Sequence, residues 1–164
     1  MTVAQGAGVG GGSLIYANIS CEAPPEVFQT GWPKEITYQV LKPYYDRVAR
    51  FMNVQMVPQN QWNPRMRLMQ EAARKIGHGD RFKQLELAVS FDPDLTLDPE
   101  NPPGPAQSRR YVNQHGIEQG YCVHLGNCDI GCDVDARNTL DKNYLAVAEK
   151  HHADVRPLHL ATDI

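Results

Sequence analysis

A proline-rich stretch, residues 92–108, limits the folds open to this chain more than any other feature. Its five prolines are Pro93, Pro99, Pro102, Pro103 and Pro105. Proline donates no backbone hydrogen bond and clashes inside a helix, so this stretch can form neither a helix nor a central strand. Loops of this length are usually functional or disordered. We therefore expect a long irregular excursion between more regular segments.

The apolar content is low for a chain of 164 residues. Leu, Ile, Val and Phe make up 22% of the chain, just above the ~20% below which charged chains tend to stay disordered. Gly and Pro together reach 15%, against about 12% on average. The composition therefore predicts either a loop-rich domain or a part of something larger.

Charge and hydropathy exclude several classes of protein. The net charge is −3 without a long block of like charge, which argues against a nucleic-acid partner. No apolar run approaches the ~18 residues that a transmembrane segment needs, and residues 1–20 lack the basic region of a signal peptide. Four cysteines are too few for a disulfide scaffold. We expect a soluble, cytoplasmic chain with reduced thiols.

Two helices are indicated in the first half of the chain by apolar residues at helical spacing. The first spans about 34–52, and Pro43 should break it near Lys42 and restart it. The second begins at Asn63-Pro64, a capping residue followed by proline at the first helical position, and ends at Gly77.

The remaining elements are shorter, and together they predict an α+β fold. Loose alternation over 84–91 favours a strand. A third helix is expected from Leu140 to about His151, followed by a strand over 154–164. Residues 14–19 are too few for their period to decide between helix and strand.

A glycine cluster, Gly-Ala-Gly-Val-Gly-Gly-Gly-Ser at 6–13, holds five glycines in eight positions. Glycine allows positive φ and close approach of the backbone to a ligand. The spacing is nearly a dinucleotide fingerprint, but no long strand precedes it and no βαβ unit follows. The cluster is therefore either a flexible turn or a loop that contacts a cofactor.

Cys122, His124, Cys128 and Cys132 form the second cluster of chemically active residues. Only Cys128 and Cys132 have a spacing common in zinc sites, and Cys122 and His124 could complete four ligands. Small buried thiols that pack as minor hydrophobes are the alternative. The six histidines are scattered, and sequence order alone assigns no catalytic constellation to them.

Two parts of the chain together resemble a known family. Residues 8–18, Gly-Val-Gly-Gly-Gly-Ser-Leu-Ile-Tyr-Ala-Asn, resemble the first signature of the glucose–methanol–choline (GMC) flavoprotein oxidoreductases, and more closely of their cholesterol-oxidase-like branch. Cys-Asp-Ile-Gly-Cys at 128–132 and the segments at 136–145 and 155–159 are similar to a later stretch of that branch. The resemblance covers most of the chain and is weakest over 54–115.

The resemblance implies an internal piece of a GMC flavoprotein fold, with FAD as cofactor. Residues 1–32 would hold the FAD-contacting loop, 33–136 a region like the substrate domain, and 137–164 a helix and strand of the FAD-binding domain. The family has an Asn-Gly pair where this chain has Tyr16-Ala17. The FAD-contacting positions carried over by the resemblance are Gly11, Gly12, Ser13, Tyr16, Asn18, Ile19 and Ala161.

The implied reaction is hydride transfer from the CH–OH group of an alcohol, sterols among them, to the flavin. Only seven residues precede Gly8, so the family's upstream dinucleotide fingerprint is missing, as is its catalytic histidine. We therefore expect an internal fragment that is inactive alone and needs the missing segments of the same enzyme. No residue is assigned as catalytic or as a metal ligand. A Cys/His metal-binding or interaction module, and a non-catalytic remnant, are the alternatives.

Overall fold

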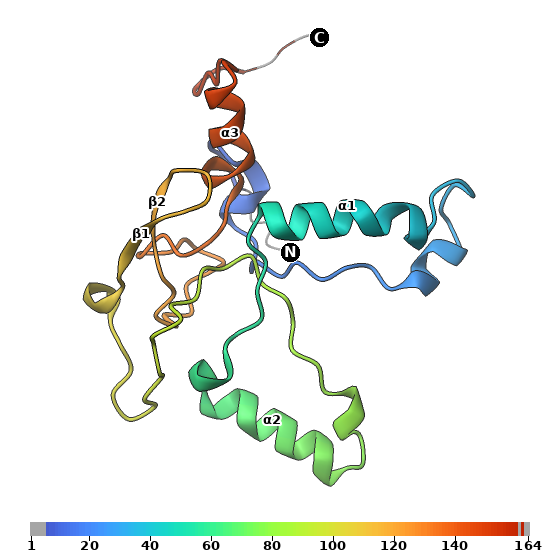
Figure 1. Ribbon diagram of the computed structural model, residues 1–164, viewed down its shortest axis with the longest axis vertical. Helices are drawn as coiled ribbons and strands as arrows, with labels where there is room; N and C mark the ends of the chain where they lie inside the picture. Colours follow the sequence, from blue (N-terminus) through green and yellow to red (C-terminus); the bar gives the residue numbers. More distant parts are fainter. Residues whose placement is uncertain (1–5, 161, 163–164) are drawn as a thin grey trace.

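The computed structural model describes residues 6–160 and 162. Helices and a small sheet make up its regular structure, which confirms the α+β class. The elements are α1 (Tyr38–Phe51), α2 (Pro64–Lys75), β1 (Arg110–Val112), β2 (Glu118–Gly120) and α3 (Tyr144–Lys150), with short 3-10 turns between them. In Figure 1, α1, α2 and α3 extend in different directions from a centre built mainly of irregular chain.

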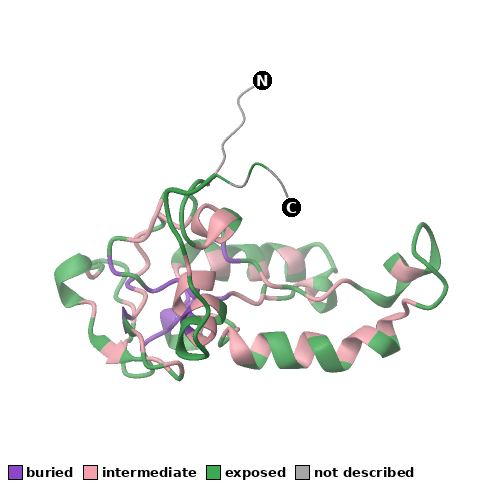
Figure 2. Ribbon diagram, turned by 90° about the horizontal axis from the view of Figure 1, so that it is seen from above, coloured by how far each residue is buried: buried purple, intermediate pink, exposed green. Residues whose placement is uncertain are grey.

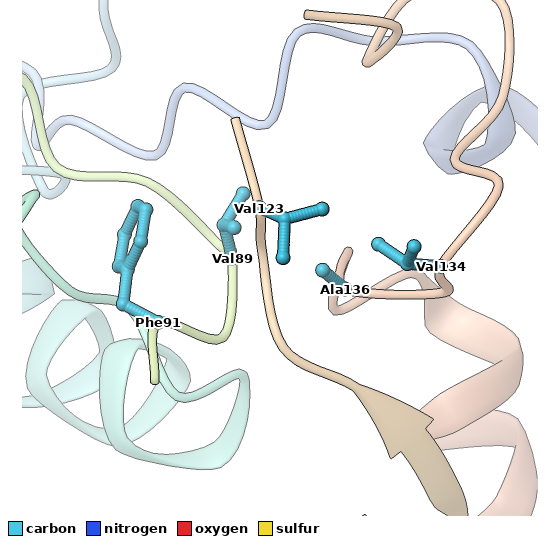
Figure 3. Packing of buried hydrophobic residues seen from close by; sticks show 5 residues of the cluster. All are labelled: Val89, Phe91, Val123, Val134 and Ala136. Carbon is cyan, nitrogen blue, oxygen red and sulfur yellow. The ribbon is translucent and has the colours of Figure 1, made fainter. Parts of the chain in front are cut away.

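An extended segment over 86–91 forms the middle of this centre. Its backbone forms hydrogen bonds with several separate segments: Leu87 pairs with Gln55, and Ala88 donates to Asn18 and accepts from Asn138. Ser90 donates to the Ala136 carbonyl and accepts from the Cys122 amide. Val89 and Phe91 of this segment form an apolar cluster with Val123, Val134 and Ala136 (Figure 3). The predicted strand over 84–91 is therefore wrong: this segment makes isolated bridges to four different partners instead of a ladder.

Few segments of the chain are buried, and Figure 2 shows them in purple near the centre. Among the described residues, slightly more polar or charged residues than apolar ones are buried. The largest fully buried side chains all carry amide or hydroxyl groups: Gln61, Gln119, Asn18, Asn143, Thr139 and Ser90. Helices α1 and α2 contribute no buried residue. The low apolar content of the sequence is thus matched by an interior held largely by hydrogen bonds.

Helix α1 continues through Pro43, so the predicted break near Lys42 is wrong. Both ends are anchored. Thr37 caps the first turn, and Asn53, with φ of 50°, closes the last. Lys42 and Asp46 form an ion pair across the proline at 2.5 Å. With its ends fixed, the helix loses one hydrogen bond at Pro43 and is not divided.

Helix α2 has the boundaries that the sequence predicted. The Asn63 side chain accepts from the Met66 amide at 3.0 Å, and Pro64 stands at the first helical position. Gly77, with φ of 76°, follows the C-cap, and the amides of Gly77 and His78 bond back to the last turn. Proline and glycine act here through local backbone geometry, which is why sequence sufficed.

The third helix ends where it was predicted to end, with His151 as its C-cap, but its start differs from the prediction. Asn143 divides it into a 3-10 turn, Leu140–Lys142, and α3, because its backbone leaves helical geometry with φ of −136°. The predicted strand after it is wrong over the described residues: 154–160 has no strand pairing, and Leu158 and Leu160 are fully or largely exposed. Leu158 has φ of 61°, which is incompatible with an extended strand.

The β1–β2 hairpin was not predicted. It pairs Arg110 with Gly120 and Val112 with Glu118 in an antiparallel register. Its short strands contain few apolar residues, so no alternating pattern marks them. Among the described residues, no helix has the length and apolar character needed to cross a bilayer.

Candidate functional site

A hollow of about 510 Å³ lies beside the glycine-rich loop and is open to solvent. Its walls come from three parts of the chain: the loop and the residues after it, one side of α1, and the start of the 3-10 turn before α3. The lining is mainly apolar and consists of Gly12, Ser13, Tyr16, Ser20, Cys21, Tyr45, Val48, Met52 and Leu140.

The position of α1 beside the loop is set by Glu22. Its carboxylate accepts from the Tyr38 hydroxyl at 2.7 Å and from the Lys42 ammonium at 2.8 Å. These hydrogen bonds hold the pKa of Glu22 below its usual range, chiefly through Lys42. The segment after the loop is thereby attached to the first turns of α1, and Tyr45, Val48 and Met52 face the hollow.

The loop itself is bent by two glycines and held by a serine. Gly10 and Gly11 have φ of 109° and 56°, values that residues other than glycine rarely adopt. The Ser13 hydroxyl donates to the Gly10 carbonyl at 2.7 Å and accepts from the Leu140 amide at 3.0 Å. The loop and the 3-10 turn before α3 are therefore joined at the wall of the hollow.

Gly12 has no conformational reason to be glycine. Its φ lies outside the positive range, and a Cβ built on it would meet nothing within 4 Å. It also lines the hollow. The space in front of its Cα is thus open in the chain alone, and a side chain there would occupy the hollow.

Several buried polar atoms behind the loop have no hydrogen-bond partner among the described residues. They include the Tyr16 hydroxyl, both amide atoms of Asn18 and Nε of Arg137. Burial raises the pKa of Tyr16, and the nearby Ser20 hydroxyl and, to a smaller extent, Arg137 act in the opposite direction. Burial raises the pKa of the Cys128 thiol, and the nearby Asn18 amide acts in the opposite direction without a hydrogen bond of ordinary geometry.

The structure places the predicted FAD-contacting residues in different surroundings. Gly12, Ser13 and Tyr16 line the hollow, and Gly11 shapes the loop next to them. Asn18 is fully buried behind the loop, and Ile19 is half exposed. Ala161 lies outside the described residues.

Sequence reasoning missed Tyr45, Val48 and Met52 of α1 as walls of this hollow, and it also missed Arg137. The apolar stripe on α1 was visible in the sequence, but it did not reveal which segment it faces. Arg137 stands in a segment whose only sequence signal was the family resemblance.

The cysteine cluster does not form a metal centre in this structure. Cys122, Cys128 and Cys132 border a small void of about 20 Å³, and burial raises the pKa of Cys122 to about 11. His124 points to Gln61, with Nε2 3.0 Å from Oε1, and burial lowers its pKa. Within residues 6–160 and 162, no group of three or more His, Cys, Asp or Glu side chains could hold a metal ion.

The family model for GMC oxidoreductases matches residues 1–84, which include the glycine-rich loop, α1 and α2. The chain belongs to the GMC oxidoreductase family, a family of flavin oxidoreductases.

Individual relatives narrow the resemblance to one branch. The chain is 31% identical to a cholesterol oxidase of Acinetobacter baumannii, over 99% of this chain and 30% of that protein. It is 35% identical to a cholesterol oxidase of Mycobacterium tuberculosis, strain CDC 1551, over 95% of this chain and 26% of that protein. It thus spans less than a third of the length of these relatives. No solved structure matches it significantly.

Proposed function

We propose that this chain supplies the flavin-facing loop and part of the substrate-facing surface of an FAD-dependent oxidoreductase that acts on CH–OH groups of alcohols, sterols among them. Gly12 is the observation that carries the proposal. Neither its φ nor its protein neighbours require glycine. A ligand lying against the backbone would require it, since close approach is a main use of glycine.

The residues around the hollow fit a flavin. A volume of about 510 Å³ lies within the ~300–1,000 Å³ typical of ligand sites. Tyr45, Val48, Met52 and Leu140 would contact the apolar faces of a flat ring. Backbone groups of the loop at Gly12 and Ser13 would lie at its edge. Buried, unpartnered donors nearby, described above, are consistent with a ligand rich in acceptors.

The contribution of this chain would be to bind and orient, not to move a proton. Bound FAD would accept a hydride from the alcohol carbon. The hollow is lined by no histidine, carboxylate or lysine among the described residues, so these walls offer no side chain that is basic at neutral pH to accept the hydroxyl proton. We therefore expect the isolated chain to bind flavin without oxidising alcohols, and the base to come from other segments of the same enzyme.

The contact between the loop and the turn before α3, made by Ser13 and Leu140, supports the assignment of 1–32 and 137–164 to the flavin-facing part. A second open hollow, of about 650 Å³, adjoins the first through Cys21 and is bordered by Met56, Trp62 and Phe82. It belongs mostly to 33–136, the region assigned to substrate. Its lining combines these large apolar side chains with the charged Glu22, Lys83 and Glu86, which would suit an alcohol with a bulky apolar body and a polar hydroxyl.

The test is a titration of the purified chain with FAD, followed by flavin fluorescence. We expect saturable binding, and Gly12→Ala should weaken it at least tenfold while leaving the melting temperature within a degree or two. Gly104→Ala is the matched control, since Gly104 has an ordinary φ of −93° and lies away from the hollow. Absence of FAD binding by the folded chain, or equal binding by the Gly12 and Gly104 variants, would refute the proposal.

A further inference from the structure

Arg137 is a buried cation without a carboxylate partner. The residue is only 7% exposed. Nη1 donates to the carbonyls of Leu14 and Cys128, each at 2.8 Å, whereas Nε is buried and makes no hydrogen bond. None of the ion pairs formed within residues 6–160 and 162 involves Arg137.

Such an arrangement is unusual because buried charges are generally paired. Two carbonyl oxygens orient the guanidinium but carry only partial negative charge. Arg109 shows the contrast, since it contacts both Asp92 and Asp94 although its side chain is 54% exposed. The positive charge at Arg137 is therefore left without a full counter-charge in the chain by itself.

The location of this charge points to the glycine-rich loop. Leu14, whose carbonyl accepts from Arg137, is the last residue of the 3-10 turn Gly11–Leu14. The Tyr16 hydroxyl and the Asn18 amide, which follow this turn in the sequence, are also buried and make no hydrogen bond within the described residues. Guanidinium N–H, amide N–H and phenol O–H groups can all donate, so the ligand suited to them is an anion with several acceptor oxygens.

We propose that Arg137 supplies the positive charge that binds a phosphate-class anion at the glycine-rich loop. Under the proposed function, on which this inference rests, the occupant is the diphosphate of the flavin dinucleotide. Arg137 then acts both as the tie between the loop and the Cys128 carbonyl and as the counter-charge that distinguishes FAD from a flavin without phosphate. Planar guanidinium groups recognise phosphate oxygens particularly well.

The experiment compares FAD, riboflavin and inorganic pyrophosphate as ligands of the whole chain. Riboflavin has the same ring as FAD but no phosphate. We expect the wild-type chain to bind FAD at least tenfold more tightly than riboflavin, with a ratio that decreases as NaCl is raised. Arg137→Gln should bring this ratio close to one and abolish binding of pyrophosphate. Arg137→Lys, which keeps the positive charge, should give a ratio whose logarithm is at least half of the wild-type value.

Arg110→Gln is the matched control. Arg110 also donates to a backbone carbonyl, that of Val134, but it is exposed and paired with Glu118. A change in stability alone would lower the affinities for FAD and riboflavin together and leave their ratio unchanged. A FAD-to-riboflavin affinity ratio in folded Arg137→Gln equal to that in Arg110→Gln, or no pyrophosphate binding by the wild type, would overturn the inference.

These outcomes separate the inference from the proposed function. If FAD and riboflavin both bind with equal affinity, the flavin site stands and the role of Arg137 is refuted. If neither flavin binds but pyrophosphate binds through Arg137, the anion site stands and the flavin assignment fails. Should Arg137→Gln not fold, two other measurements still test the role of Arg137. A wild-type ratio that NaCl does not lower, or a ratio close to one in Arg137→Lys, would refute it.

Discussion

The hydroxyl of Ser13 connects the glycine-rich loop to Leu140, at the opposite end of the chain. It accepts from the Leu140 amide at 3.0 Å while donating to the Gly10 carbonyl at 2.7 Å. One small side chain thus closes the loop on itself and fixes it against the turn before α3. The shape of the hollow depends on this contact, since Ser13 and Leu140 both line it.

Replacing Ser13 with alanine should therefore destabilise the chain and loosen the loop. Loss of both hydrogen bonds is expected to lower the free energy of unfolding by about 1–2 kcal/mol, measured by urea denaturation. FAD affinity should fall as well. Ser20→Ala is the control for stability alone, because Ser20 also lines the hollow and its hydroxyl makes one long bond of 3.3 Å to the Asn18 carbonyl. Equal losses of unfolding free energy in the two variants would contradict the role assigned to Ser13.

Gln119 is a central member of the polar interior. Its amide nitrogen donates to the Arg137 carbonyl and to Asn138 Oδ1, and its oxygen accepts from Asn113. Gln119→Leu would leave several of these buried groups unpartnered, so we expect a loss on the order of 3 kcal/mol in unfolding free energy. Glu118→Gln, at a neighbouring exposed position, should cost less than about 1 kcal/mol. A Leu variant as stable as the wild type would contradict this role of Gln119.

Gly120 is required by space and not by its φ. A Cβ at this position would lie 2.1 Å from the Val134 carbonyl oxygen and 2.6 Å from Ser108 Oγ. Gly120→Ala should therefore displace the hairpin from the 134–136 segment and lower the melting temperature by more than 10 °C, as measured by circular dichroism. Gly12→Ala provides the comparison, since its Cβ meets open space. Similar melting temperatures for both variants would contradict this packing.

The stability of the chain should decrease at alkaline pH because of Cys122. Burial raises the pKa of its thiol to about 11, from an ordinary value of 9.0. The folded state therefore holds this proton more tightly than the unfolded state, and the stabilisation present below pH 9 is lost as the pH rises towards 11. Cys122→Ala should weaken the pH dependence of the unfolding free energy over this range, whereas Cys21→Ala, at an exposed position, should not. A decline of equal slope in both variants would rule out Cys122 as its origin.

Local sequence signals predicted the parts of this fold that local geometry controls. Asn63, Pro64 and Gly77 defined α2 because capping and positive φ act within a few residues. The segment over 86–91 was harder: its alternating side chains resemble a strand, yet its backbone partners come from four separate segments. At Pro43 the sequence predicted a break that does not occur. The ends of α1 are anchored by Thr37 and Gln114, which lie outside the helix.

The candidate site divides along the same line. From the sequence by itself came the α+β class, the glycine-rich loop, and the family resemblance that the comparisons confirmed. Only the tertiary structure decided that α1 forms the other wall of the hollow and that Arg137 lies buried behind Leu14 without a carboxylate. The reason is physical: backbone conformation follows from neighbouring residues, whereas burial, charge pairing and the walls of a cavity depend on which distant segments meet.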